Sequence, residues 1–113
     1  MDRTVSSDRL RERFDEFNEI GATERGGVNR PSLSDANRRA RDRLVEWFEA
    51  AGLTVTVDEL GNIFGRRPGR NDDLPPVLVG SHVDSQYNGG RYDGVIGVLG
   101  GLEIVETLND AGI

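Results

Sequence analysis

Apolar residues recur at helical spacing in two stretches of the first half of the chain. The first stretch places them four, three and three residues apart, which predicts one buried face of an amphipathic helix: Leu10, Phe14, Phe17 and Ile20. Gly21 is the predicted terminator, and a loop is expected over 21–33, where two adjacent glycines and a proline occur. A second helix is predicted between an N-cap at Ser34 and a C-cap glycine at Gly52, with this apolar stripe: Ala40, Leu44, Trp47, Phe48 and Ala51.

The next stretch has the period of a half-buried β-strand. Its apolar residues alternate with polar ones: Leu53, Val55 and Val57. We expect Asn62–Arg66 to pair with this strand around a turn at Glu59–Gly61. A polar stretch with prolines, over 67–76, ends the predicted hairpin.

A short, continuously apolar run follows the hairpin. It predicts an interior strand over Val77–Ser81, buried on both faces, with His82 at its carboxyl end. Gly97, Gly100 and Gly101 then fall in a last helix, where they suit a backbone packed closely on a sheet. The apolar positions of that helix follow the helical period: Val95, Val98, Leu99, Leu102, Val105 and Leu108. These elements predict an α/β fold, a mixed sheet with helices packed on it.

Composition limits the class of protein and its partners. Hydrophobic residues make up 35% and charged residues 30%, as in a soluble globular domain. The N-terminal stretch lacks the apolar region of a secretory signal, and no apolar run approaches the ~20 residues that span a bilayer, so we expect a cytoplasmic protein without a membrane partner. The net charge of −6 argues against nucleic acid. All basic residues are arginine, which excludes a P-loop lysine, and the absence of cysteine excludes a thiolate metal site.

The segment after the predicted interior strand has the candidate chemistry. His82 is the only histidine and lies where α/β proteins place ligand sites, outside the carboxyl end of a strand. Asp84, two residues on, can hold one ring nitrogen while the other binds a metal. Asp93 follows a glycine-rich loop, at the start of the last helix. Spacing alone leaves open a surface histidine, a loop cap at Asp84 and a helix N-cap at Asp93.

The wording of this segment resembles a known family. Residues 80–103, GSHVDSQYNGGRYDGVIGVLGGLE, are similar to the metal-binding signature of the hydantoinase/carbamoylase amidohydrolases, in the wider zinc aminopeptidase/deacylase clan. That group includes N-carbamoyl-L-amino-acid hydrolases, allantoate amidohydrolases and ureidopropionases. Further stretches resemble the family in the same order: 21–23, 26–30, 49–53 and 58–66. We therefore interpret residues 1–113 as the N-terminal portion of a longer hydrolase catalytic domain.

The resemblance implies a two-metal hydrolase that acts on small carbamoyl or ureido compounds. In that family His82 would ligate one ion, Asp93 would bridge two, and Asp84 would be the active-site carboxylate that holds His82. Two zinc ions are expected, and manganese or cobalt suits the same ligand types. Family members also have a glutamate pair that includes the general base, two further histidine ligands and a lid domain, and they form homodimers. Because this sequence has no counterpart of those groups, we expect the isolated chain to be inactive.

Three alternatives stay open at the level of sequence. A peptidase or deacylase of the same clan would differ in the lid, although the wording of 88–93 favours the carbamoylase branch. A calcium-binding loop is suggested because EF-hand positions 1, 3, 5 and 6 are matched by Asp84, Gln86, Asn88 and Gly89. However, Val95 stands where the bidentate glutamate belongs. The third alternative is a non-catalytic α/β remnant that folds, or only partly folds, without metal.

Overall fold

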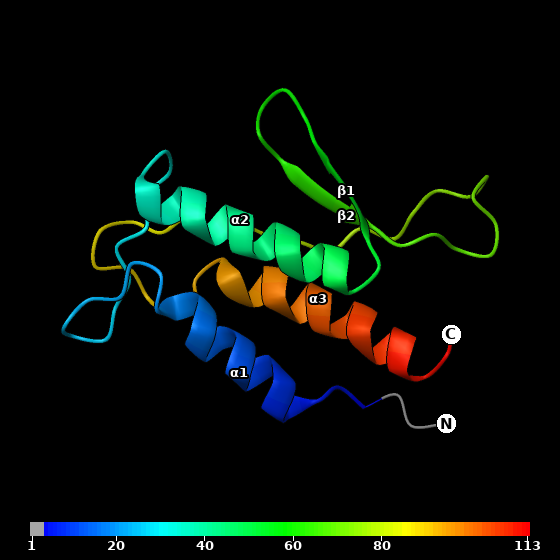
Figure 1. Ribbon diagram of the computed structural model, residues 1–113, viewed down its shortest axis with the longest axis horizontal. Helices are drawn as coiled ribbons and strands as arrows, with labels where there is room; N and C mark the ends of the chain where they lie inside the picture. The colour runs from blue at the N-terminus through cyan, green and yellow to red at the C-terminus, as the bar shows by residue number, and fades with distance from the viewer. Residues whose placement is uncertain (1–3) are drawn as a thin grey trace.

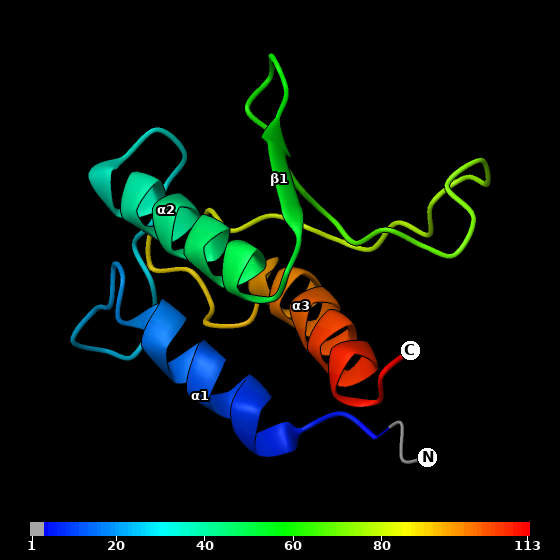
Figure 2. The same ribbon diagram turned by 45° about the vertical axis from the view of Figure 1, so that its right-hand side comes forward.

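The computed structural model describes residues 4–113, which form three helices and one β-hairpin (Figure 1). The elements in chain order are α1 (Ser7–Asn18), α2 (Asp35–Ala50), β1 (Thr54–Val57), β2 (Ile63–Arg66) and α3 (Val95–Asp110). α1 and α3 lie side by side in both views, and the hairpin projects from the C-terminal end of α2 (Figures 1 and 2). None of the helices within 4–113 has the length and apolar composition that a membrane crossing requires.

Local hydrogen bonds begin and end α2 where the sequence predicts. The Ser34 hydroxyl oxygen accepts the backbone N–H of Asn37 at 3.1 Å, as an N-cap does. Gly52 has φ +81°, and the N–H of Leu53 returns to the carbonyl of Phe48 at 3.0 Å. This glycine-centred C-cap stops the helix and turns the chain directly into β1.

The predicted hairpin is confirmed. β1 and β2 are antiparallel, with Val57 opposite Ile63 next to the turn. The Asp58 carboxylate accepts the backbone N–H groups of Leu60 and Asn62 at 3.0 and 2.8 Å. A side chain that binds its own following backbone in this way closes the loop locally, so the register follows from the turn.

One hydrophobic core joins the helices and the hairpin. Its buried members are Phe14, Phe17, Ala40, Leu44, Trp47, Phe48, Leu53, Val83, Val95, Leu99 and Leu102. β2 comes close to α2 at Gly65, where an added Cβ would lie 2.6 Å from a ring carbon of Phe48. The core therefore extends from the helices onto one face of the hairpin.

A buried carboxylate fastens α1 to α3. Glu103, whose side chain is only 3% exposed, accepts the Arg9 Nε–H at 2.7 Å and the Ser6 backbone N–H at 2.7 Å. The Thr107 hydroxyl donates to the same carboxylate at 3.1 Å. Burial acts to raise the pKa of Glu103, but these hydrogen bonds outweigh it and hold the pKa below its ordinary value.

The prediction of an interior strand over Val77–Ser81 is wrong. These residues join no strand, and Val77, Leu78 and Val79 are 98%, 79% and 55% exposed. Within 4–113 the sheet is the antiparallel pair β1–β2, so the segment has no strand neighbour to bond with. The segment passes close to α3, since Cβ atoms added at Gly97 and Gly101 would lie 2.7 Å from Ser81 Cβ and 3.2 Å from Val79 Cγ1. The α/β class is confirmed, but the run of apolar residues is exposed. Gly97 and Gly101 do allow a close approach, to this segment and not to a sheet, and Gly100 meets nothing within 4 Å.

Candidate metal centre

The imidazole of His82 lies between two carboxylates. Its Nδ1 atom is 3.1 Å from Asp84 Oδ1 and 3.0 Å from the Asp84 carbonyl oxygen. Its Nε2 atom faces Asp93, with Oδ2 at 3.6 Å. Two acceptors at Nδ1 favour the tautomer with the proton on Nδ1, because a neutral imidazole has one donor and one acceptor nitrogen. That tautomer leaves the Nε2 lone pair directed toward Asp93.

A tight turn at Gly94 brings Asp93 to the ring. Gly94 has φ +71° and ψ −51°, and the Val95 N–H donates to the Asp93 carbonyl at 2.8 Å, which together define a γ-turn with positive φ. A Cβ added at Gly94 would lie 2.4–2.6 Å from three atoms of the His82 ring. Glycine is therefore required twice at this position, by the backbone conformation and by the space that the ring occupies.

A second loop supports the segment from its buried side. Val28 and Gly89 exchange backbone hydrogen bonds of 2.9 Å in both directions. The Ser32 hydroxyl donates to Asp84 Oδ2 at 2.9 Å, while the other oxygen of that carboxylate faces His82. The predicted loop over 21–33 is thus a structural support of the site.

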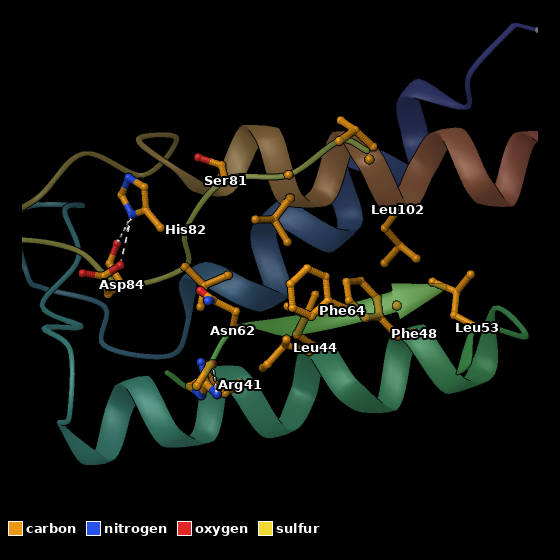
Figure 3. A pocket seen from close by; sticks show the side chains of 18 of the residues that line it. Arg41, Leu44, Phe48, Leu53, Asn62, Phe64, Ser81, His82, Asp84 and Leu102 are labelled. Carbon is orange, nitrogen blue, oxygen red and sulfur yellow. Dashed lines mark hydrogen bonds and ion pairs between the residues drawn. The ribbon is translucent and has the colours of Figure 1, made fainter. Parts of the chain in front are cut away.

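The site opens at one end of a groove. Figure 3 shows His82 and Asp84 at this end, with Phe48 and Phe64 further along. The cavity of ≈ 670 Å³ lies between α2 and the hairpin on one side and α3 with residues 78–84 on the other. His82, Asp84 and Asp93 are 51%, 38% and 75% exposed, so a solute reaches all of them.

The separation of Nε2 and Oδ2 fits a shared ion. Two ligand atoms bound to one tetrahedral ion at about 2.1 Å lie roughly 3.4 Å apart, close to the observed 3.6 Å. The chain offers two ligands on this geometry, since Asp84 occupies the opposite side of the ring. Within 4–113 no group of three or more His, Cys, Asp or Glu residues is arranged to hold a metal by itself. These residues fit part of a metal site.

The structure disfavours the calcium-loop alternative. Val95, which stands at the position of the bidentate glutamate, is 1% exposed and belongs to the core. Asp84, at the first position of that loop, uses both carboxylate oxygens on His82 and Ser32. A calcium loop instead directs such oxygens at a common ion.

Sequence reasoning placed His82, Asp84 and Asp93 at the site, and the structure brings these three side chains together. The sequence analysis gave no role to Ser32 and did not identify the turn at Gly94. A glycine that directly follows a candidate ligand and precedes a helix could have been the signal for the turn, because such a position often needs positive φ.

Comparison with known proteins gives several close matches. No family model matches the sequence. The chain is 48% identical over 110 residues to an N-carbamoyl-L-amino-acid amidohydrolase of a Pseudomonas strain. It is 37% identical over 109 residues to a ureidoglycolate hydrolase of Arabidopsis thaliana. The solved amidase of the hydantoinase/carbamoylase family from Burkholderia vietnamiensis is 53% identical and superposes on the whole chain with a TM-score of 0.97.

These relatives are much longer than the chain. The Pseudomonas match covers 97% of this chain and 27% of the relative, and the Arabidopsis match covers 96% and 23%. The Burkholderia structure is covered over 28% of its own length. The chain thus corresponds to about a quarter of each relative.

Proposed function

The chain belongs to the hydantoinase/carbamoylase family of amidases, and on that premise we propose that it forms part of a metal-dependent hydrolase of carbamoyl or ureido compounds. The relatives named for N-carbamoyl-L-amino acids and for ureidoglycolate support this substrate class. Both kinds of substrate present a ureido carbonyl and a carboxylate. We place N-carbamoyl-L-amino acids first, because these relatives are the more similar in sequence.

The observation that carries the proposal is the alignment of two carboxylates on the two nitrogens of one imidazole. Asp84 holds Nδ1, and Asp93 lies 3.6 Å from Nε2. A carboxylate behind a ligating histidine fixes its tautomer and makes it a better ligand. We therefore assign His82 and Asp93 as metal ligands and Asp84 as the residue that orients His82.

A divalent ion held by these residues would act as a Lewis acid toward the ureido carbonyl. Zinc is the ion we propose, with manganese and cobalt compatible with one nitrogen and one oxygen ligand. The residues of this chain hold and orient the histidine ligand. Asp84 accepts the Nδ1–H of His82, the Ser32 hydroxyl donates to Asp84, and Gly94 leaves room for the imidazole ring. We assign the general base and the remaining ligands to no residue of this chain.

A chimera tests the function directly. The 113 residues replace the matching quarter of the Burkholderia vietnamiensis amidase. This exchange is possible because the match includes 100% of this chain and 28% of the amidase. We expect the chimera to hydrolyse N-carbamoyl-L-amino acids, and we expect His82→Ala and Asp93→Ala to abolish the reaction. Gln86→Ala is the matched control, because this exposed side chain lies in the same loop.

The substrate panel distinguishes the branches of the clan. Dipeptides and N-acetyl amino acids are assayed beside the carbamoyl compounds. A folded, zinc-loaded chimera that turns over only peptides would contradict the substrate class, and one that turns over nothing would contradict the function. We expect the 113-residue chain alone to release no measurable product, since losing the general base removes a factor of about 10²–10⁴ by itself.

A further inference from the structure

Arg30 is a buried cation next to the site. Only 1% of it is exposed. Its guanidinium carbon lies 4.6 Å from the centre of the Phe17 ring. Its side chain donates to three backbone carbonyls: Val83 at 2.7 Å, Ile20 at 2.8 Å and Phe17 at 3.3 Å. Because burying a charge without compensation is very unfavourable, so complete a burial indicates a specific task.

The carbonyl partners of Arg30 come from two different parts of the fold. Phe17 lies in the last turn of α1 and Ile20 two residues beyond its end, where backbone carbonyls carry partial negative charge. Val83 lies in the segment of the metal centre, between His82 and Asp84. The guanidinium therefore ties the end of one helix to the backbone of the site.

The backbone of Arg30 holds the same segment at a second point. Its N–H donates to the Ser85 hydroxyl at 2.9 Å, and its carbonyl accepts the Ser85 N–H at 2.8 Å. Val83 and Ser85 are buried at 9% and 7% exposure, whereas His82 is exposed and Asp84 is half-buried. In an extended segment, alternate residues point to opposite sides. By holding Val83 and Ser85 on the buried side, Arg30 thus sets the direction in which the side chains of His82 and Asp84 point.

We propose that Arg30 is a positioning residue, which acts through Val83 and Ser85 to hold Asp84 against His82 and so keep Nε2 free for metal. The inference rests on the metal role assigned to His82. Arginine suits the task because its planar fork offers five donors in fixed directions. A lysine ammonium, as a single point charge, cannot reach Val83 and the end of α1 in the same geometry. Burial lowers the pKa of Arg30 while the charge of Asp84 raises it, so the two groups interact electrostatically as well.

The single histidine gives a direct readout. NMR correlation of the ring nitrogens with the ring carbon-bound protons reports which nitrogen carries the proton, and here the signals belong to His82 alone. In the 113-residue chain we expect the Nδ1–H tautomer to dominate. We expect Arg30→Met to give a mixture of tautomers and to lower the affinity for zinc, titrated alone, about tenfold or more.

Arg9→Met is the matched control. Arg9 also bonds to the buried Glu103, but from the first turn of α1, so this variant loses stability without touching Val83. We expect it to keep the tautomer of the wild type. If Arg30→Met stays folded with unchanged ring signals and zinc affinity, the proposal is overturned. If Arg30→Met does not fold, Arg30→Lys and Ser85→Ala decide in its place: shifted ring signals support the proposal, and unchanged signals in both overturn it.

The order of measurements separates this inference from the proposed function. Ring signals are recorded before zinc is added. A wild-type chain that binds no zinc, with ring signals that still change in Arg30→Met, would count against the metal role and support the positioning role.

Discussion

Gly94→Ala is the sharpest test of the site geometry. The γ-turn at Gly94 has φ +71°, a value that residues with a Cβ rarely adopt. The new methyl group would also lie 2.4–2.6 Å from Cε1, Nδ1 and Nε2 of His82. The substitution therefore attacks the turn and the imidazole together.

The size of the effect follows from the backbone strain and from the steric overlap with the His82 ring. Holding alanine at such a backbone conformation costs about 1–3 kcal/mol. Ordinary carbon contacts lie near 3.5–4.0 Å, so the ring has to move by roughly 1 Å. Ligand distances in metal sites tolerate only about 0.2 Å, and disturbing a ligand's surroundings lowers affinity about 10–100-fold. We expect a loss of zinc binding that exceeds what the loss of stability explains.

The assay combines a urea melt with an NMR zinc titration, which suits the weak binding expected of two ligands. Gly90→Ala is the matched control, because Gly90 lies in the same loop, has no positive φ and has nothing within 4 Å of an added Cβ. We expect Gly90→Ala to behave as wild type in both measurements. Unchanged His82 ring signals and zinc response in Gly94→Ala would refute the geometry of the site described above.

Three further outcomes are expected. Gly97→Ala, whose Cβ would lie 2.7 Å from Ser81, should displace the site segment, whereas Gly100→Ala, which meets nothing, should stabilise α3 by about 0.5–1 kcal/mol in a thermal melt. Because the pKa of Glu103 is lowered in the folded state, its carboxylate contributes stability above its ordinary pKa of 4.5, and this stability is lost as the pH falls through the lowered pKa. Glu103→Gln should therefore reduce the free energy of unfolding at pH 7 by about 1–3 kcal/mol. In a series of urea melts at different pH, the variant should also lose less stability on acidification than the wild type. The exposed run around Leu78 should cause self-association in sedimentation, which Leu78→Ser reduces and Leu60→Ser, on the hairpin turn, does not; a monomer with full cooperative stability would contradict this expectation.

The parts of the fold that the sequence predicted are those with local causes. The Ser34 cap, the Gly52 stop and the hairpin turn each depend on residues within a few positions. The prediction of an interior strand at Val77–Ser81 was wrong because burial on both faces requires neighbouring strands. A continuous apolar run shows that a segment is suited to such burial, but it does not show whether the neighbouring strands are present. Within 4–113 no strand pairs with this segment.

The site shows the same division. Spacing placed His82 and Asp93 on either side of a glycine-rich loop, and the resemblance of residues 80–103 to a family signature implied that the two side chains meet, as they do in the structure. Arg30 had no assigned role, because its partners at Ile20 and Val83 come from distant parts of the chain. A buried arginine that bonds to carbonyls leaves no periodic signal, and only the three-dimensional arrangement reveals it.

The contact between Arg9 and Glu103 has a consequence for how the chain folds as it is made. The two residues are 94 positions apart, and at about 5–20 residues per second a ribosome takes roughly 5–20 s to pass from one to the other. When residue 66 has been made, α1 is complete but still lacks α3, while the hairpin already has every residue that its own turn needs. Of the three helices described, α1 is therefore synthesised first and is among the last to be secured, and Phe14 and Phe17, which are buried in the folded chain, lack the cover of α3 until then.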